Sequence, residues 1–182
     1  MEHFSDALLV KKINKIVSVL EEKIISSTQK IENVTYTESG YTKNNLPPEN
    51  AVWQPLEENT EFACQDRHYW FHFTLNTPNA APDEAVYLSF KTGREGQWDA
   101  VNPQMLLFLN GEIVQGVDTN HTEVKVSPQT CYDAYGYFYA GLSGESVRFS
   151  PSVFVKNTAV EALYYDIRVP FEGAKLFGIE YL

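Results

Sequence analysis

The sequence has little cysteine and lacks a long uninterrupted apolar run. Its 182 residues include two cysteines, Cys64 and Cys131. These are too few for a disulfide scaffold, and neither belongs to a C-x-x-C pair that would indicate zinc or redox chemistry. We therefore expect two buried thiols. The first twenty residues lack the apolar core and the cleavage site of a signal peptide, which predicts a cytoplasmic protein without a membrane span.

Positive charge is also scarce. The chain has 14 Lys and Arg against 24 Asp and Glu, a formal net charge of −10. Nucleic acids and anionic membranes both bind basic patches, so we exclude both as partners. The acidic residues are spread along the chain without the cluster that a cation site requires, which indicates a solvated surface.

Aromatic residues, by contrast, are abundant: 11 Tyr and 11 Phe raise the aromatic share to 14%. Such usage suits half-buried strands better than helix faces. From Tyr69 onward, short apolar runs alternate with turn residues, as in a sandwich or barrel. A further run, Leu176–Leu182, is also strand-like. The predicted strands are Tyr69–Asn76, Ala85–Phe90, Gln104–Leu109, Glu112–Val117, Glu123–Val126, Tyr135–Leu142, Val147–Val155 and Glu161–Val169.

The amino-terminal residues show a different pattern. Apolar side chains recur at spacings of three and four between Ser5 and Ser27, which predicts an amphipathic α-helix. An isolated helix of this length is only marginally stable in water, so its stripe must pack on the sandwich, another domain or another subunit. The stripe consists of Leu9, Ile13, Ile16, Val17, Leu20 and Ile24.

A tight hairpin is the clearest local prediction. Asn110-Gly111 readily adopts the positive φ angles of a type I′ turn, which would join Gln104–Leu109 to Glu112–Val117 in antiparallel. No βαβ alternation follows residue 60, so a parallel sheet is disfavoured. The predicted fold class is all-β, an antiparallel jelly-roll-like β-sandwich over residues 31–182 with an N-terminal α-helix within residues 1–30.

Three segments, taken in order, resemble one family. They are Asp66–Phe71 (DRHYWF), Thr92–Asp99 (TGREGQWD), and Asn110-Gly111 with Val114–Asp118 and Asn120-His121. Together they are similar to the amino-terminal domain of bacterial α-mannosidases of glycoside hydrolase family 38. The likeness spans about Val52 to Leu182 and includes Trp53–Leu56 and Leu176–Gly178. His72 departs from the pattern, because the family usually has a basic residue, most often arginine, after the Tyr-Trp-Phe run.

The resemblance implies a galactose-binding-like sandwich without catalytic residues, metal or cofactor of its own. It also implies a parent enzyme that hydrolyses terminal α-mannosides with retention, using zinc and an Asp nucleophile in a catalytic domain expected after residue 182. The chain's partner would be that catalytic domain, and its role would be to shape the active-site entrance. A free-standing carbohydrate-binding module for mannosides and a homo-oligomerisation domain remain alternatives.

Eight residues are candidates for sugar binding or for a domain interface. An indole can stack on a pyranose while Arg, Asp and Asn bind its hydroxyls. A loop anchored by an Arg–carboxylate pair explains the same residue types structurally, and residues 118–121 also suit a capped turn. Spacing alone does not make Glu95 and Asp99 a catalytic pair. The candidates are Arg94, Glu95, Trp98, Asp99, Asn102, Asp118, Asn120 and His121.

Two further sets of side chains raise the question of a site. Tyr135, Tyr137 and Tyr139 alternate with other residues and should share one sheet face. The row is either an exposed aromatic platform or a layer packed between sheets, and packing is favoured because strands of any function are rich in aromatics. His68 and His72 would lie about 13 Å apart along a strand, too far to share a metal ion.

Overall fold

The computed structural model describes residues 2–42, 46–97 and 102–177. These divide into two compact units. A sandwich unit comprises residues 29–79 and 86–153, and a helical unit comprises residues 1–28, 80–85 and 154–182.

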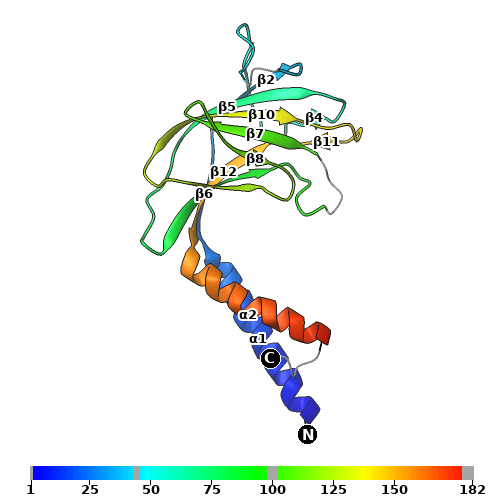
Figure 1. Ribbon diagram of the computed structural model, residues 1–182, viewed down its shortest axis with the longest axis vertical. Helices are drawn as coiled ribbons and strands as arrows, with labels where there is room; N and C mark the ends of the chain where they lie inside the picture. Colours follow the sequence, from blue (N-terminus) through cyan, green and yellow to red (C-terminus); the bar gives the residue numbers. More distant parts are fainter. Residues whose placement is uncertain (1, 43–45, 98–101, 178–182) are drawn as a thin grey trace. The chain divides into compact units, whose positions relative to one another are not determined.

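The strands of the described residues form antiparallel sheets (Figure 1). A four-stranded sheet has the order β1-β12-β6-β9, a six-stranded sheet has the order β3-β2-β5-β10-β7-β8, and β11 pairs with β4. The predicted antiparallel β-sandwich with an N-terminal helix is confirmed. The strands are β1 Ile25–Lys30, β2 Thr35–Ser39, β3 Gln54–Pro55, β4 Phe62–Ala63, β5 His68–Asn76, β6 Glu84–Lys91, β7 Gln104–Leu109, β8 Glu112–Val117, β9 Glu123–Val126, β10 Cys131–Tyr139, β11 Ser146–Val147 and β12 Ser150–Asn157.

The core of the sandwich unit is built from aromatic rings. Phe71 of β5 stacks on Phe149 with centroids 3.8 Å apart and meets Phe138 of β10 edge-on at 5.5 Å. The space beside the inward side of β10 is also tight: a Cβ on Gly136 would lie 2.5 Å from the sulfur of Met105. Because side chains alternate between the faces of a strand, the inward positions of β5 and β10 set which residues face outward.

The three tyrosines of β10 face outward. Ala134, Gly136 and Phe138 are the buried positions of this strand, whereas Tyr135, Tyr137 and Tyr139 are only half-buried. The preference for core packing of these tyrosines is therefore wrong. The inward positions are filled by small residues and one Phe, and the tyrosines cover the other side of the sheet.

The predicted hairpin is confirmed. β7 and β8 pair in antiparallel with Leu109 opposite Glu112. Asn110 and Gly111 have φ angles of 53° and 83°, both positive as a type I′ turn requires. A register shift between Leu107 and Phe108 adds one residue to β8, a β-bulge that the sequence pattern does not reveal.

The helical unit contains α1 (Glu2–Ile24) and α2 (Thr158–Phe177), which lie side by side (Figure 1). The N-terminal helix is confirmed, but its packing stripe is rotated from the predicted one. Leu9 and Ile16 are 44% and 48% exposed. The other four predicted residues are half-buried, together with two that were not predicted. The half-buried apolar residues of α1 are Val10, Ile13, Val17, Val19, Leu20 and Ile24. Neither helix, within the residues described, is long and apolar enough to cross a bilayer.

The strand predicted over Glu161–Val169 is wrong, because these residues belong to α2. Asn157 caps the helix: its side-chain oxygen accepts the Val160 amide at 2.9 Å. Tyr164, Phe171 and Ala174 then form a buried helical stripe. Capping and packing override the strand propensity of the Leu-Tyr-Tyr and Ile-Arg-Val runs.

Smaller corrections concern strand limits and one thiol. The strand predicted at Tyr135–Leu142 runs from Cys131 to Tyr139, and Val147–Val155 is divided between β11 and β12. Of the run Leu176–Leu182, the first two residues end α2 and the rest lie outside the described residues. Cys64 is buried as expected, but Cys131 is exposed because it begins β10 at the edge of the core.

Candidate functional site

Loops that are distant in sequence meet at one end of the sandwich unit, which we call the loop end: residues 64–67, 92–97, 102–103, 118–122 and 140–146. The antiparallel order brings them together, since the last residue of β10, Tyr139, lies opposite the first residues of β5 and β7. Backbone hydrogen bonds join the loops. The Asp66 amide donates to the Gly141 carbonyl at 2.9 Å, and the Gly96 amide donates to the Thr119 carbonyl at 3.5 Å.

Glu95 closes the loop that follows β6. Its carboxylate accepts hydrogen bonds from the Thr92 amide, from the Thr92 hydroxyl at 2.9 Å and from the Gly93 amide at 3.1 Å. Partial burial would raise the pKa of this carboxyl, but the hydrogen bonds outweigh it and hold the pKa below its ordinary value. Glu95 is therefore an ionised structural group and is poorly suited to act as a proton donor.

Arg94 ties two loops together. Its guanidinium lies 2.7 Å from the Glu145 carboxylate and also donates to Gln97 and to the Ser143 hydroxyl. The side chain is 18% exposed, so most of it is covered by these partners. The predicted Arg–carboxylate anchor is confirmed. Its acidic partner, Glu145, was missed because it belongs to a loop far along the chain.

Asp118, Asn120 and His121 form the capped turn that the sequence predicted. One Asp118 oxygen accepts the amides of Asn120 and His121 at 2.8 and 2.7 Å, and the other lies 3.0 Å from the His121 ring nitrogen. Burial would raise the Asp118 pKa, but the hydrogen bonds from His121 and Asn120 lower it overall. Asn120 and His121 are both exposed at the loop end.

Asn102 also lies at the loop end. A Cβ added to Gly141 would meet the Asn102 Cβ at 2.6 Å, so the backbone of the loop after β10 passes directly over this side chain. The structure thus brings together Arg94, Glu95, Asn102, Asp118, Asn120 and His121. The remaining two candidates, Trp98 and Asp99, lie outside the described residues.

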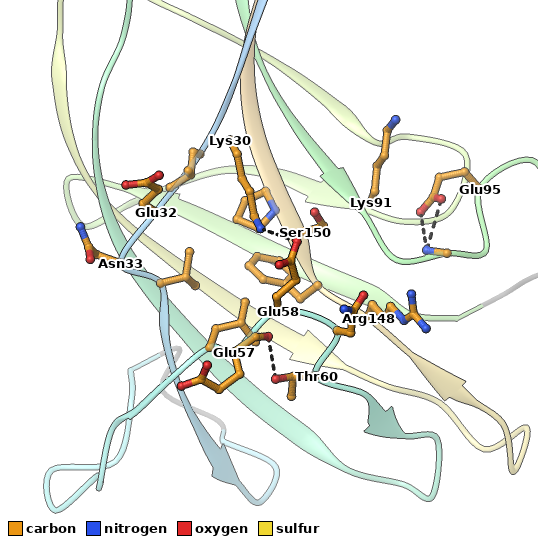
Figure 2. Close-up of a pocket in the computed structure, with 17 residues that line it drawn as sticks. Lys30, Glu32, Asn33, Glu57, Glu58, Thr60, Lys91, Glu95, Arg148 and Ser150 are labelled. Atoms are coloured by element: carbon orange, nitrogen blue, oxygen red, sulfur yellow. Dashed lines mark hydrogen bonds and ion pairs between the residues drawn. The ribbon is translucent and has the colours of Figure 1, made fainter.

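A hollow of about 480 Å³ adjoins the loop end, with Gly93 and Glu95 in its lining (Figure 2). Its volume is within the usual range for ligand sites. Figure 2 shows Lys30 reaching Glu58, an ion pair with a nitrogen–oxygen distance of 3.4 Å. Both side chains are mostly exposed, so this pair adds little to stability. Sequence reasoning missed the hollow because residues 30–34, 56–60, 91–95 and 148–151 meet only in the fold.

The described side chains form no candidate metal centre. In residues 2–42, 46–97 and 102–177, no group of three or more His, Cys, Asp and Glu is placed to hold an ion. His72 is 2.7 Å from Asp133, and His68 stacks on Tyr137 with centroids 5.3 Å apart. Each histidine therefore has its own separate environment on β5.

No protein-family model and no curated protein sequence matches this chain. Among solved structures, it is similar to the β-glucuronidase of Ruminococcus gnavus. The apo structure is 10% identical with a TM-score of 0.41 over 71% of this chain and 28% of that chain. The complex with D-glucaro-d-lactam is 11% identical with a TM-score of 0.42, over 72% and 29% respectively. This chain thus spans less than a third of those structures, and a likeness at this TM-score bears on neither its activity nor its substrate.

Proposed function

We propose that this chain is the non-catalytic amino-terminal β-sandwich domain of a retaining α-mannosidase of glycoside hydrolase family 38. Its loop end packs on the catalytic domain and shapes the entrance to the active site. One observation carries the proposal: residues of all three segments that resemble the family, in 66–67, 92–97 and 118–121, meet at the loop end.

The residues gathered there are not those that a sandwich core requires. Gly93, Glu95 and Asn120 are exposed, and Arg94 is held by polar partners. Loops fixed on a rigid scaffold commonly carry binding residues. Because these loops are already ordered by hydrogen bonds, little conformational entropy would be lost when they pack on another domain. The loop end, with polar side chains held in place by hydrogen bonds, therefore suits an interface beside an active site.

The ionised state of Glu95 and Asp118 supports a location of the catalytic residues outside this chain. A glycosidase needs one carboxyl as a proton donor and one as a base or nucleophile. Glu95 and Asp118 both accept hydrogen bonds from their own loops, and these bonds lower both pKa values. In this proposal the zinc and the nucleophile belong to the catalytic domain of the parent enzyme, which we expect in the cytoplasm.

The test compares two proteins: the 182-residue chain, and the same chain extended by whatever the gene encodes after codon 182. We expect no nitrophenol release from p-nitrophenyl α-D-mannopyranoside by the chain alone. The extended protein should release it, lose activity with a chelator and regain it with zinc. An extended protein that leaves this substrate intact, or a gene that stops at codon 182, would contradict the proposal.

A paired substitution tests the role of the loop end. Asn120→Arg places a bulky charge at the exposed loop end, and Glu112→Arg places one beside the hairpin turn, where β8 begins. We expect the first to lower the activity of the extended protein and the second to leave it unchanged. Both variants of the isolated chain should unfold at the wild-type urea concentration, because both positions are exposed.

Self-association is a second candidate function, favoured by the helical unit. Large apolar side chains are exposed on both of its helices, more than isolated surface residues would explain. Light scattering should then detect a dimer, and the pair Ile16→Glu and Val169→Glu should convert it to a monomer without loss of helix. The exposed side chains are Leu8, Leu9 and Ile16 of α1 and Leu163, Tyr165, Val169, Leu176 and Phe177 of α2.

A further inference from the structure

The outward face of β5 and β10 carries a double row of rings. The strand register places His68 opposite Tyr139, Trp70 opposite Tyr137 and His72 opposite Tyr135. The Trp70 and Tyr137 centroids are 4.9 Å apart, and those of His72 and Tyr135 are 4.3 Å apart, both in stacked arrangements. Since these rings face away from the sandwich core, the fold itself does not account for their accumulation here.

One end of this row forms a small pocket. It has a volume of about 260 Å³ and is lined by Leu46, Pro47, Trp70, Phe108, Gly111 and Tyr135. Much of the lining is aromatic: the ring centroids of Phe108, in β7, and Trp70 are 5.6 Å apart. Among the residues that the structure describes, no charged side chain belongs to this lining, and the described lining therefore suits a neutral ligand.

Trp70, which lines the pocket, has an unused hydrogen-bond donor. Trp70 is 1% exposed, and its indole Nε1 has no hydrogen-bond partner in the part of the chain that the structure describes. Buried polar groups are nearly always hydrogen-bonded, because an unpaired one loses its water without compensation. An indole NH in an aromatic pocket is therefore matched by a ligand that brings its own acceptor oxygen.

We propose that this pocket binds a neutral pyranose. The C–H groups on the apolar face of a sugar ring carry partial positive charge and stack on the negative faces of Tyr135 and Phe108. A ring or hydroxyl oxygen accepts the hydrogen bond of the Trp70 indole. An α-mannoside is the expected sugar, which rests on the proposed function. A uronic acid is disfavoured, because none of the described lining residues is a cation that would pair with its carboxylate.

The probe is methyl α-D-mannopyranoside, titrated into the 182-residue chain and followed by calorimetry and by tryptophan fluorescence. We expect saturable binding, and no binding of D-glucuronate. Tyr135→Ala should weaken the affinity about tenfold, the order expected for loss of one stacked ring. Tyr139→Ala is the matched control: it lies on the same strand and face but outside this pocket, and its affinity should stay at the wild-type value.

A second variant isolates the hydrogen bond. Trp70→Phe keeps an aromatic ring and removes the indole NH, so it should weaken binding about fivefold or more. Because Trp70 is buried, the smaller ring should also lower the urea midpoint, and binding is therefore measured without urea on protein whose circular dichroism matches that of the wild type. Absence of saturable binding by folded protein would overturn the proposal, as would affinities unchanged in Tyr135→Ala and Trp70→Phe. Displacement of the sugar by a proline-rich peptide of higher affinity would assign the pocket to peptides instead.

The outcome is separable from that of the proposed function. An extended enzyme that cleaves α-mannosides, in which the isolated chain binds no sugar, refutes the pocket alone. If the chain binds the mannoside in the pocket but the extended protein has no mannosidase activity, the pocket is supported and the proposed function fails.

Discussion

The guanidinium of Arg94 lies 2.7 Å from the carboxylate of Glu145, and this ion pair joins the loop after β6 to the loop after β10. Arg94→Ala should lower the free energy of unfolding by about 1–2 kcal/mol, because charged hydrogen bonds of a mostly covered side chain are lost. Arg67→Ala is the control, since its pair with Glu38 is about half-exposed; it should cost less than about 1 kcal/mol. Urea unfolding measures both, and equal losses would contradict a special role for Arg94.

The hairpin turn provides a test of backbone conformation. Gly111 has a φ of 83° and open space around it, so Gly111→Val is strained by the backbone and not by crowding. We expect a loss of about 1 kcal/mol or more. Gly116, on the same hairpin, also has open space but no positive φ. Gly116→Val should be neutral or stabilising in thermal unfolding, since valine favours strands; similar losses at the two sites would argue against the turn assignment.

Glu95 should make stability depend on pH. Its pKa is lower in the folded chain than the ordinary 4.5, so the folded state favours the ionised carboxylate. The stabilisation is present above about pH 4.5 and is lost as the pH falls through the folded-state pKa. Glu95→Gln should therefore be less stable than wild type at pH 7, and the difference should shrink on acidification. Chemical denaturation at several pH values would show this; a difference independent of pH would exclude the carboxylate as its source.

The helical unit can be tested with two neighbouring tyrosines. Tyr164 is 2% exposed and donates a hydrogen bond to Glu21 of α1, whereas Tyr165 is 52% exposed. Tyr164→Ala should destabilise the chain by about 3 kcal/mol, because it leaves a cavity between the helices. Tyr165→Ala should change stability by less than about 1 kcal/mol. Circular dichroism during thermal unfolding measures both. A larger effect at Tyr165 would mean that Tyr165, and not Tyr164, packs against α1, and would contradict the packing described here.

Features that depend on neighbouring residues were predictable. The Asn110-Gly111 turn needs only two residues that tolerate positive φ, and the strand predicted over Tyr69–Asn76 needs only a run rich in aromatic residues. The same holds for the Asp118 turn, whose hydrogen bonds span three residues. Each of these predictions is confirmed, because the interactions involved join residues that are close together in the sequence.

Features that depend on distant residues were missed. The run from Glu161 to Val169 has strand-like residues, yet the cap at Asn157 and the packing of Tyr164 on α1 make it helical. Glu145 could not be identified as the partner of Arg94 from spacing alone. The two faces of β10 carry either the tyrosines or Ala134, Gly136 and Phe138. Which of these two sets faces inward depended on the space that the opposite sheet leaves, and the sequence does not give that space.

By itself, the sequence determined the β-rich class, the amino-terminal helix, the hairpin and the residue types of the loop end, because turn chemistry and periodicity are local. Only the tertiary structure decided that loops beginning at residues 64, 92, 118 and 140 meet, and that the tyrosine row faces outward. It also decided that the Trp70 indole NH has no partner among the residues described. These outcomes depend on which distant strands pair and which side of each sheet is covered, and the free energy of that choice is spread over the whole core.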